Sequence, residues 1–291
     1  MPVHPAASAL LRLTPRERAL IAVLHELRYL TAQQVQQICF STITVAGASR
    51  RLSILRRRGV LECLAHRTFD DRRAFWGLTA CGRAAAAGLA GQRPDRPGAA
   101  ATAALQMEHL IMTNQIFCDL CREHRAGRLS SFRWFGSHHT HVDLGHTHLV
   151  PDALILFPSP SRAWWMYFLE LDRHTMSMPA LAEKFERYAL MQRIASTRAD
   201  DPVWEARAGG WVVFACGDDR RASAVMDLAA AYGLDRIWAG TAETCAGGLA
   251  AVIGPESGEF IPAIQQGPDP AASGWGIAPP RFDDAAAAAR R

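Results

Sequence analysis

Polar and apolar residues follow a helical period in three successive stretches near the N-terminus. TPRE at 14–17 has the form of a capping box, and the apolar residues after it predict a helix at about 15–28. TAQQ at 31–34 is a second capping box and begins a short helix. The next stretch, STITVAGASRRLSILRRRG, carries an apolar stripe at helical spacing, and Gly59 stands where a C-terminal cap belongs. Three short helices are therefore predicted before residue 60.

Two strands and a further helix follow these three helices. VLECLAHRTF and RAFWGLT alternate or run apolar as strands do, with Asp70 and Asp71 at the turn between them. ACGRAAAAGLA returns to a helical pattern. Three helices and then a β-hairpin is the order of a winged helix-turn-helix, whose third helix enters the DNA major groove. We therefore assign residues 1–90 to such a domain.

The pattern changes after residue 90. GQRPDRPGAAATA, at 91–103, is rich in Gly, Pro and Ala and is typical of a linker. From 104 to 264 a long amphipathic helix is followed by alternating strands and helices, the order of an α/β (α+β) domain with a mixed sheet. AAVIGP, near residue 250, is interpreted as a last strand. Residues 265–291 have the composition of a disordered tail.

Composition limits the class of protein. Apolar residues make up 49% of the chain, enough for a sizeable core. No apolar run is long enough for a membrane span, and the N-terminus lacks the apolar segment of a signal peptide. The seven cysteines are odd in number and scattered, which is typical of free thiols in a reducing compartment. We expect a cytoplasmic protein with no membrane partner.

Charge is distributed unevenly along the chain. Residues 1–90 carry 13 arginines against 5 acidic residues, whereas residues 104–265 carry 14 basic against 19 acidic residues. A basic head on a mildly acidic body indicates that the head binds a polyanion, which for a winged helix is double-stranded DNA. The alternative is a solvated helix face that complements the helix dipole. The predicted DNA-binding residues are Thr44, Ser49, Arg50, Arg51, Arg56, Arg57, Arg58, Arg72 and Arg73.

Three carboxylates are predicted to meet in the second domain. Glu170 and Asp172 end one strand at positions i and i+2, so their side chains share a face, and a hairpin can bring Asp152 beside them. Such a cluster needs a cation or protons, and a hard ion such as Mg²⁺ or Mn²⁺ takes oxygen ligands. Lys184, the one lysine in the sequence, and Tyr188 lie four residues apart on one helix face. This lysine is a candidate for contacting a scissile phosphate.

Structural interpretations compete with this metal site. Asp152 can cap a turn, Glu170 can pair with a neighbouring arginine, and Lys184 can be a surface lysine. Glu108, on the helix that begins the domain, is a weaker metal candidate. The loop HHTHVDLGHTH, at 138–148, offers five histidines to a transition metal such as Zn²⁺, or it is an exposed hairpin with one histidine facing the carboxylates.

The carboxylate pattern resembles the PD-(D/E)XK nucleases, which have the restriction-endonuclease-like fold. Their motif is Pro-Asp, a spacer, and then Glu-x-Lys on the next strand. This sequence has Asp172 in place of that lysine. Some members carry the lysine on the following helix, and Lys184 fits that variant. The spacing from Lys184 to Tyr188 is similar to the Gln-x-x-x-Tyr motif of some members. The resemblance implies Asp152, Glu170, Lys184 and Tyr188 as catalytic residues.

The chain as a whole resembles the replication-relaxation family of plasmid and conjugative-element proteins. The matching pieces are LTPRERAL, LTAQQVQQICF, RRLSILRRRGVL, WGLTACGR, EHLIMTN, PDALI, FLELDRHTM and EKFERY. The resemblance implies a winged helix that binds DNA in plasmid replication, relaxation or mobilisation. Related mobilisation relaxases use His, Asp and Glu-x-Glu, to which His148, Asp152 and Glu170-x-Asp172 are similar. A Gly-Thr is expected after the Glu-Leu-Asp-Arg, and His174-Thr175 stands there instead.

Three functions are consistent with the sequence. The first is a DNA-binding accessory that acts at an origin and contacts a relaxase or replication proteins. The second is an enzyme, a Mg²⁺-dependent DNA nickase. The third is a transcriptional regulator. Winged helices often bind DNA as dimers, so a homodimer is one expectation. No Gly-rich phosphate loop of the G-x-x-x-x-G-K type occurs in the sequence, which argues against an NTPase.

Overall fold

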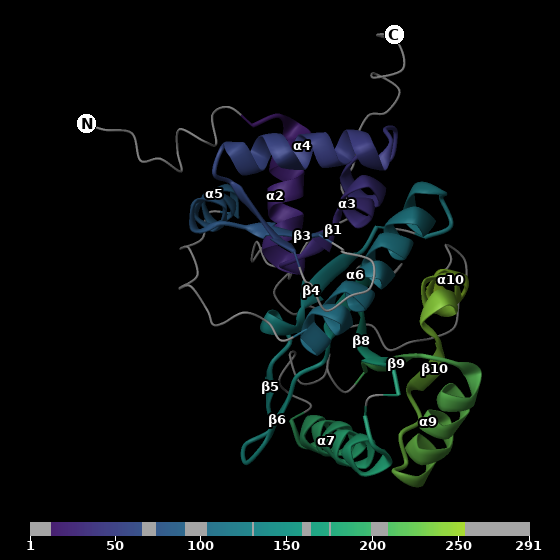
Figure 1. The fold of residues 1–291 in the computed structure, drawn as a ribbon. Coiled ribbons are helices and arrows are strands. Elements are labelled where there is room, and N and C mark those ends of the chain that lie inside the picture. The colour runs from purple at the N-terminus through teal and green to yellow at the C-terminus, as the bar shows by residue number, and fades with distance from the viewer. Residues whose placement is uncertain are drawn as a thin grey trace. The chain divides into compact units, whose positions relative to one another are not determined.

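The structure is a computed structural model, and the described residues form two compact units. The first unit extends to Cys121 and the second begins at Arg122. Within the described residues there are eight α-helices and a mixed five-stranded sheet, so the fold class is α+β (Figure 1). The described ranges are 13–65, 74–90, 104–129, 131–158, 164–174, 176–198 and 209–253.

The first unit contains short helices around a small antiparallel sheet. Strand β3 lies between β1 and β2 and is antiparallel to both. Both predicted capping boxes are present, and Gly59 ends the third helix at a φ of 72°. The two-residue strand β1 was not expected from the sequence. The elements are α2 (Pro15–Leu27), β1 (Leu30–Thr31), α3 (Ala32–Cys39), α4 (Val45–Arg57), β2 (Leu61–Ala65), β3 (Ala74–Leu78), α5 (Ala80–Ala90) and most of α6 (Ala104–Arg125).

The segment WGLTACGR forms the junction between β3 and α5, and the structure shows what its Thr79 and Gly82 do there. The hydroxyl of Thr79 donates to the carbonyl of Gly59 at 2.6 Å and accepts from the backbone N–H of Gly82 at 3.0 Å. A Cβ added at Gly82 would lie 2.2 Å from the carbonyl oxygen of Val60. No side chain fits there, so this glycine allows α5 to begin directly against the end of α4.

Helix α6 is tied to the first unit by buried amides. Asn114 donates to the carbonyls of Leu27 and Tyr29 at 2.9 and 2.8 Å, where the chain leaves α2 with Arg28 at a φ of 62°. Gln34 donates to the carbonyl of Ile111 at 2.8 Å. These bonds join α6 to the end of α2 and to α3 through side-chain amides. The first compact unit therefore includes most of α6, whereas the sequence places a domain boundary at 104.

The second unit is built on the mixed sheet, in the order β10-β9-β8-β7-β4. Strands β8, β9 and β10 are parallel, and β7 is antiparallel to both β8 and β4. A separate two-stranded ribbon is formed by β5 and β6. The elements are β4 (Arg133–Gly136), η1 (Ser137–His139), β5 (Val142–Asp143), β6 (His148–Leu149), β7 (Ala153–Pro158), β8 (Trp164–Asp172), α7 (Met178–Thr197), β9 (Trp211–Cys216), α9 (Asp219–Ala231), β10 (Ile237–Thr241) and α10 (Ala242–Ile253).

The core of the second unit lies between one sheet face and helices α7 and α9. Phe168 of β8 and Phe214 of β9 pack there against Phe185 and Tyr188 of α7 and Val225 of α9. The even-numbered residues of β8 line this face, because side chains alternate along a strand. Glu170 and Asp172 continue the same row, so two carboxylates extend from an apolar core.

The predicted last strand is wrong, because residues 250–253 belong to helix α10. Cys245, Ala246, Leu249, Ala250 and Ile253 are buried, a spacing that suits a helix. None of the helices in the described ranges is long and apolar enough to cross a membrane. The predicted linker and tail, and the boundaries at 90 and 264, fall on or border residues outside those ranges and stay predictions.

Candidate functional site

The carboxylates of Asp152 and Glu170 come together at the pairing of β7 and β8. Asp152 immediately precedes β7, and its backbone N–H donates to the carbonyl of Leu169 at 3.0 Å. Its Oδ2 accepts the backbone N–H of Leu171 at 2.8 Å. Because Ala153 pairs with Leu169, Asp152 lies across from Glu170. The hairpin expected from the sequence therefore brings these two acids together.

Glu170 is fully buried, and helix α7 satisfies its carboxylate. Lys184 places its ammonium Nζ 2.5 Å from Oε2, and the Tyr188 hydroxyl donates to Oε1 at 2.7 Å. The Lys184 side chain is only 17% exposed. One helical turn separates the two donors, so α7 presents both to the same carboxylate. Lys184 is therefore not a surface lysine, and Glu170 has a lysine and a tyrosine as partners.

Burial and neighbouring charges together set the protonation of this trio. Burial raises the pKa of Glu170 to about 7, against the opposing effect of the Lys184 ammonium. Burial acts to lower the pKa of Lys184. The carboxylates of Glu170 and Asp152 raise it by more, so the pKa lies above its ordinary value and the ammonium keeps its charge. Burial and Glu170 both raise the pKa of Tyr188 well above its ordinary value. The tyrosine therefore remains a hydrogen-bond donor.

Asp172 has a different counter-ion, which comes from helix α9. Arg221 donates its Nε to Asp172 Oδ2 at 2.6 Å, and the two side chains are 10% and 0% exposed. The same guanidinium donates to the carbonyl of Met176 at 2.8 Å. Arg221 thus joins the end of β8 to the turn that precedes α7. A guanidinium that binds a buried carboxylate and a backbone carbonyl acts as a structural clamp.

In the turn after β8, His174 stands where the family resemblance led us to expect glycine. His174 adopts a φ of 63°, a left-handed conformation in which glycine costs least. Its Nε2 lies 3.1 Å from a carboxylate oxygen of Asp218, the residue that caps α9. A Cβ at Gly217 would lie 2.8 Å from the His174 ring, so glycine there leaves room for the imidazole. The local turn expected for glycine is thus retained with histidine.

The metal site predicted on Asp152, Glu170 and Asp172 stays a prediction, and in this structure the three acids are bound by groups of the protein. The oxygens of these three residues do not all lie within 4.8 Å of one another. Both oxygens of Glu170 already accept hydrogen bonds, and Asp172 is held by Arg221. All three acids thus accept hydrogen bonds from the protein, and two of them have a cationic partner.

The remaining predicted site residues lie elsewhere. His148 is exposed on β6, and its ring stacks on that of His141 with centroids 5.2 Å apart. Glu108 lies on the part of α6 that belongs to the first unit. Arg72 and Arg73 fall outside the described residues. The catalytic role of His148, the metal-binding role of Glu108 and the DNA-binding roles of Arg72 and Arg73 stay predictions.

Helix α4 presents a cationic outer face. Ala48, Leu52 and Leu55 are fully buried, and the opposite side of the helix is exposed. Thr44 is the N-cap of the helix, and Ser49 is half-buried. Arg58 places its Nη1 3.9 Å from Oε1 of Glu17. The outermost exposed positions, spaced i, i+4, i+7 and i+11, are Ala46, Arg50, Ser53 and Arg57.

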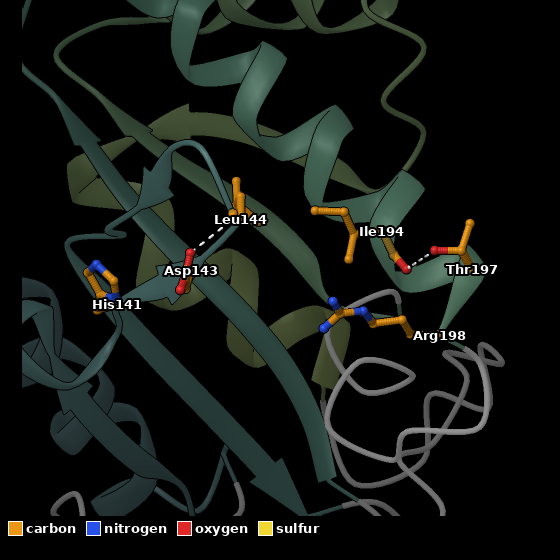
Figure 2. A pocket seen from close by; sticks show the side chains of 7 residues that line it. His141, Asp143, Leu144, Ile194, Thr197 and Arg198 are labelled. Atoms are coloured by element: carbon orange, nitrogen blue, oxygen red, sulfur yellow. Dashed lines mark hydrogen bonds between the residues drawn. The ribbon is translucent and has the colours of Figure 1, made fainter.

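A pocket of about 520 Å³ lies in the second unit, apart from the carboxylates. Figure 2 shows His141 and Asp143 of the β5 region on one wall and Thr197 and Arg198, at the end of α7, on the other. None of the acids discussed above lines it. The pocket is a concave surface that the sequence did not predict.

Arg221 and Asp218 were missed by reasoning from the sequence. The signal was present in DDRRASAV, because Arg220 and Arg221 stand in the first turn of a helix, where the dipole disfavours cations. An arginine at that position needs a compensating acid. The sequence could not show that the acid is Asp172, because the pair spans 49 residues.

One comparison with known proteins found a match. A family model described as replication-relaxation matches residues 21–202, which is more than half of the chain. The match includes α4, Asp152 before β7, and the helix that carries Lys184. No curated protein and no solved structure matches the chain. The chain belongs to the replication-relaxation family.

Proposed function

We propose that this chain binds double-stranded DNA at an origin during plasmid or conjugative-element replication or mobilisation. Helix α4 is the element that contacts the DNA. The family supports the biological setting, and the order of helices and strands in the first unit is that of a winged helix-turn-helix. The single observation that carries the proposal is the exposed arginine-bearing face of α4.

The outer face of α4 suits a nucleic acid more than a solvated surface. Small residues, Ala46 and Ser53, alternate there with Arg50 and Arg57. Small side chains allow the helix backbone to approach base edges, whereas arginines reach guanine edges or phosphates. The sequence of α4 contains no acidic residue. A helix face that served only solubility would carry both signs of charge.

The proposal is tested by fluorescence anisotropy with a duplex that carries the origin of the element encoding this chain. The double variant Arg50→Ala/Arg57→Ala should bind about 10- to 100-fold more weakly, as expected when two arginines no longer reach the DNA. The matched control is Arg193→Ala/Arg220→Ala, which removes two exposed arginines from the second unit. Equal affinity of both variants would contradict the proposal.

The same assay separates the two DNA-binding functions. An accessory of replication or mobilisation prefers the origin duplex, whereas a transcriptional regulator prefers a promoter duplex. We favour the accessory, because the family description points to replication and relaxation.

A nickase receives less support. The favourable observation is the approach of Asp152, Glu170 and Lys184 on adjacent elements, as the nuclease resemblance implies. Against it stand the closed bonding of Glu170 and the pairing of Asp172 with Arg221. Supercoiled origin plasmid, incubated with the protein and Mg²⁺ or Mn²⁺, should therefore stay supercoiled. Nicking that is lost in Lys184→Ala, while circular dichroism shows that this variant is still folded, would establish the enzyme.

A further inference from the structure

The β5–β6 ribbon carries three metal-binding side chains on one face. His148 pairs directly with Asp143 across the ribbon, and His141 precedes β5. His141, Asp143 and His148 are exposed, whereas Val142 and Leu149 are buried. Because side chains alternate along a strand, the three polar residues share the outer face.

The ribbon is held in place by core packing and by side-chain hydrogen bonds. Its inner residues, Val142 and Leu149, pack in the core that α7 forms with the sheet. At its base, the Thr140 hydroxyl donates to the carbonyl of Pro151 at 2.7 Å. At its tip, the N–H of Gly145, at a φ of 89°, donates to Asp143 Oδ1 at 2.8 Å. The backbone that carries the three side chains is therefore fixed.

The two imidazoles already lie together. The rings of His141 and His148 are stacked, with centroids 5.2 Å apart and planes at 21°. Two histidines and one carboxylate form a donor set for divalent transition ions, which bind imidazole nitrogen, and a poor one for Mg²⁺, which prefers oxygen. The donor atoms of the three residues do not yet all lie within 4.8 Å of one another. To hold one ion, the three exposed side chains have to rotate until each donor atom lies about 2.1 Å from the metal.

We propose that His141, His148 and Asp143 form a binding site for a divalent transition ion such as Zn²⁺ or Ni²⁺. The site goes beyond DNA binding by α4 and does not depend on it. Two of its three donors, His141 and Asp143, also line the pocket in Figure 2. The opposite wall of that pocket carries Thr197 and Arg198. Three protein donors leave coordination positions open, as in metal sites that accept a further ligand.

The test is calorimetric titration of the untagged, chelator-stripped full chain with Zn²⁺ and with Ni²⁺. Wild type should bind one equivalent of each metal. His141→Ala and His148→Ala should each weaken binding at least tenfold, and Asp143→Ala should weaken it by a smaller factor. The matched control is His146→Ala, which removes an exposed histidine from the turn of the same ribbon and should change the affinity less than twofold.

Three outcomes would overturn the proposal. The first is a chain that takes up neither metal. The second is uptake that survives in both His141→Ala and His148→Ala. The third is an equal loss in His146→Ala, which would indicate diffuse binding by a histidine-rich loop. Circular dichroism of each variant establishes that the fold is retained. Co²⁺ absorption reports on the ligands directly, because imidazole coordination changes its visible spectrum in the folded chain.

Discussion

The two units of this chain use their cations in opposite ways. In the first unit, Arg50 and Arg57 stand in solvent on the outer face of α4. In the second, Lys184 and Arg221 are mostly buried, and each binds a carboxylate within 2.6 Å. An exposed arginine costs the fold little and is available to a partner, whereas a buried cation is committed to its acid. Positive charge alone therefore does not identify a binding surface, because a buried cation is not available to a partner.

The largest effect is expected from removing Lys184. Lys184→Ala leaves the buried carboxylate of Glu170 without its counter-ion and should lower the free energy of unfolding by about 3–5 kcal/mol at pH 8. The measurement is urea denaturation followed by circular dichroism. The double variant Lys184→Met/Glu170→Gln should recover much of the loss, because no uncompensated charge remains. An exposed lysine would give a change of less than about 0.5 kcal/mol.

Arg221 offers a second test with a neighbouring control. Arg221→Ala leaves Asp172 buried and unpaired and frees the carbonyl of Met176, so the free energy of unfolding should fall by about 3 kcal/mol. Arg220→Ala, one residue earlier on the exposed side of α9, should cost less than about 0.5 kcal/mol. If the two variants are equally stable, Arg221 is not the clamp described above.

The buried acid makes stability depend on pH. The folded pKa of Glu170 is raised to about 7, above its ordinary value of 4.5. Between these pH values the folded chain holds a proton that the unfolded chain releases. This contribution is complete below about pH 4.5 and is lost as the pH rises through about 7, by at most about 1.4 kcal/mol per pH unit. Glu170→Gln should remove this fall, as measured by urea denaturation of both proteins from pH 5 to 8. Parallel pH profiles would contradict the assignment.

The smallest effect concerns His174. His174→Gly relieves a left-handed backbone but loses the bond to Asp218, so the free energy of unfolding should change by less than about 1 kcal/mol. His174→Val keeps the backbone strain with a β-branched side chain and should cost about 1–2 kcal/mol. Thermal unfolding of the two variants measures the difference. Equal stability would show that the positive φ is not what limits this position.

Local patterns predicted more of the structure than long-range pairing. Both capping boxes and the cap at Gly59 depend on neighbouring residues and were predicted. The approach of Asp152 to Glu170 follows from one hairpin and was also predicted. The partner of Asp172 was not, because it depends on how α9 packs against the sheet. The placement of α6 in the first unit depends on Asn114, whose acceptors lie more than 80 residues away.

The central claim is that the exposed arginines of α4 bind DNA, whereas the buried Lys184 and Arg221 stabilise the fold. The direct measurement determines, for the same protein samples, both the free energy of unfolding and the affinity for origin DNA across a range of salt concentrations. Arg50→Ala/Arg57→Ala should keep the wild-type free energy of unfolding and bind the DNA about 10- to 100-fold more weakly. The slope of log affinity against log salt concentration should become shallower in this variant. It should change by about one for each phosphate that the variant no longer neutralises. Wild-type affinity and salt dependence in this variant would contradict the account.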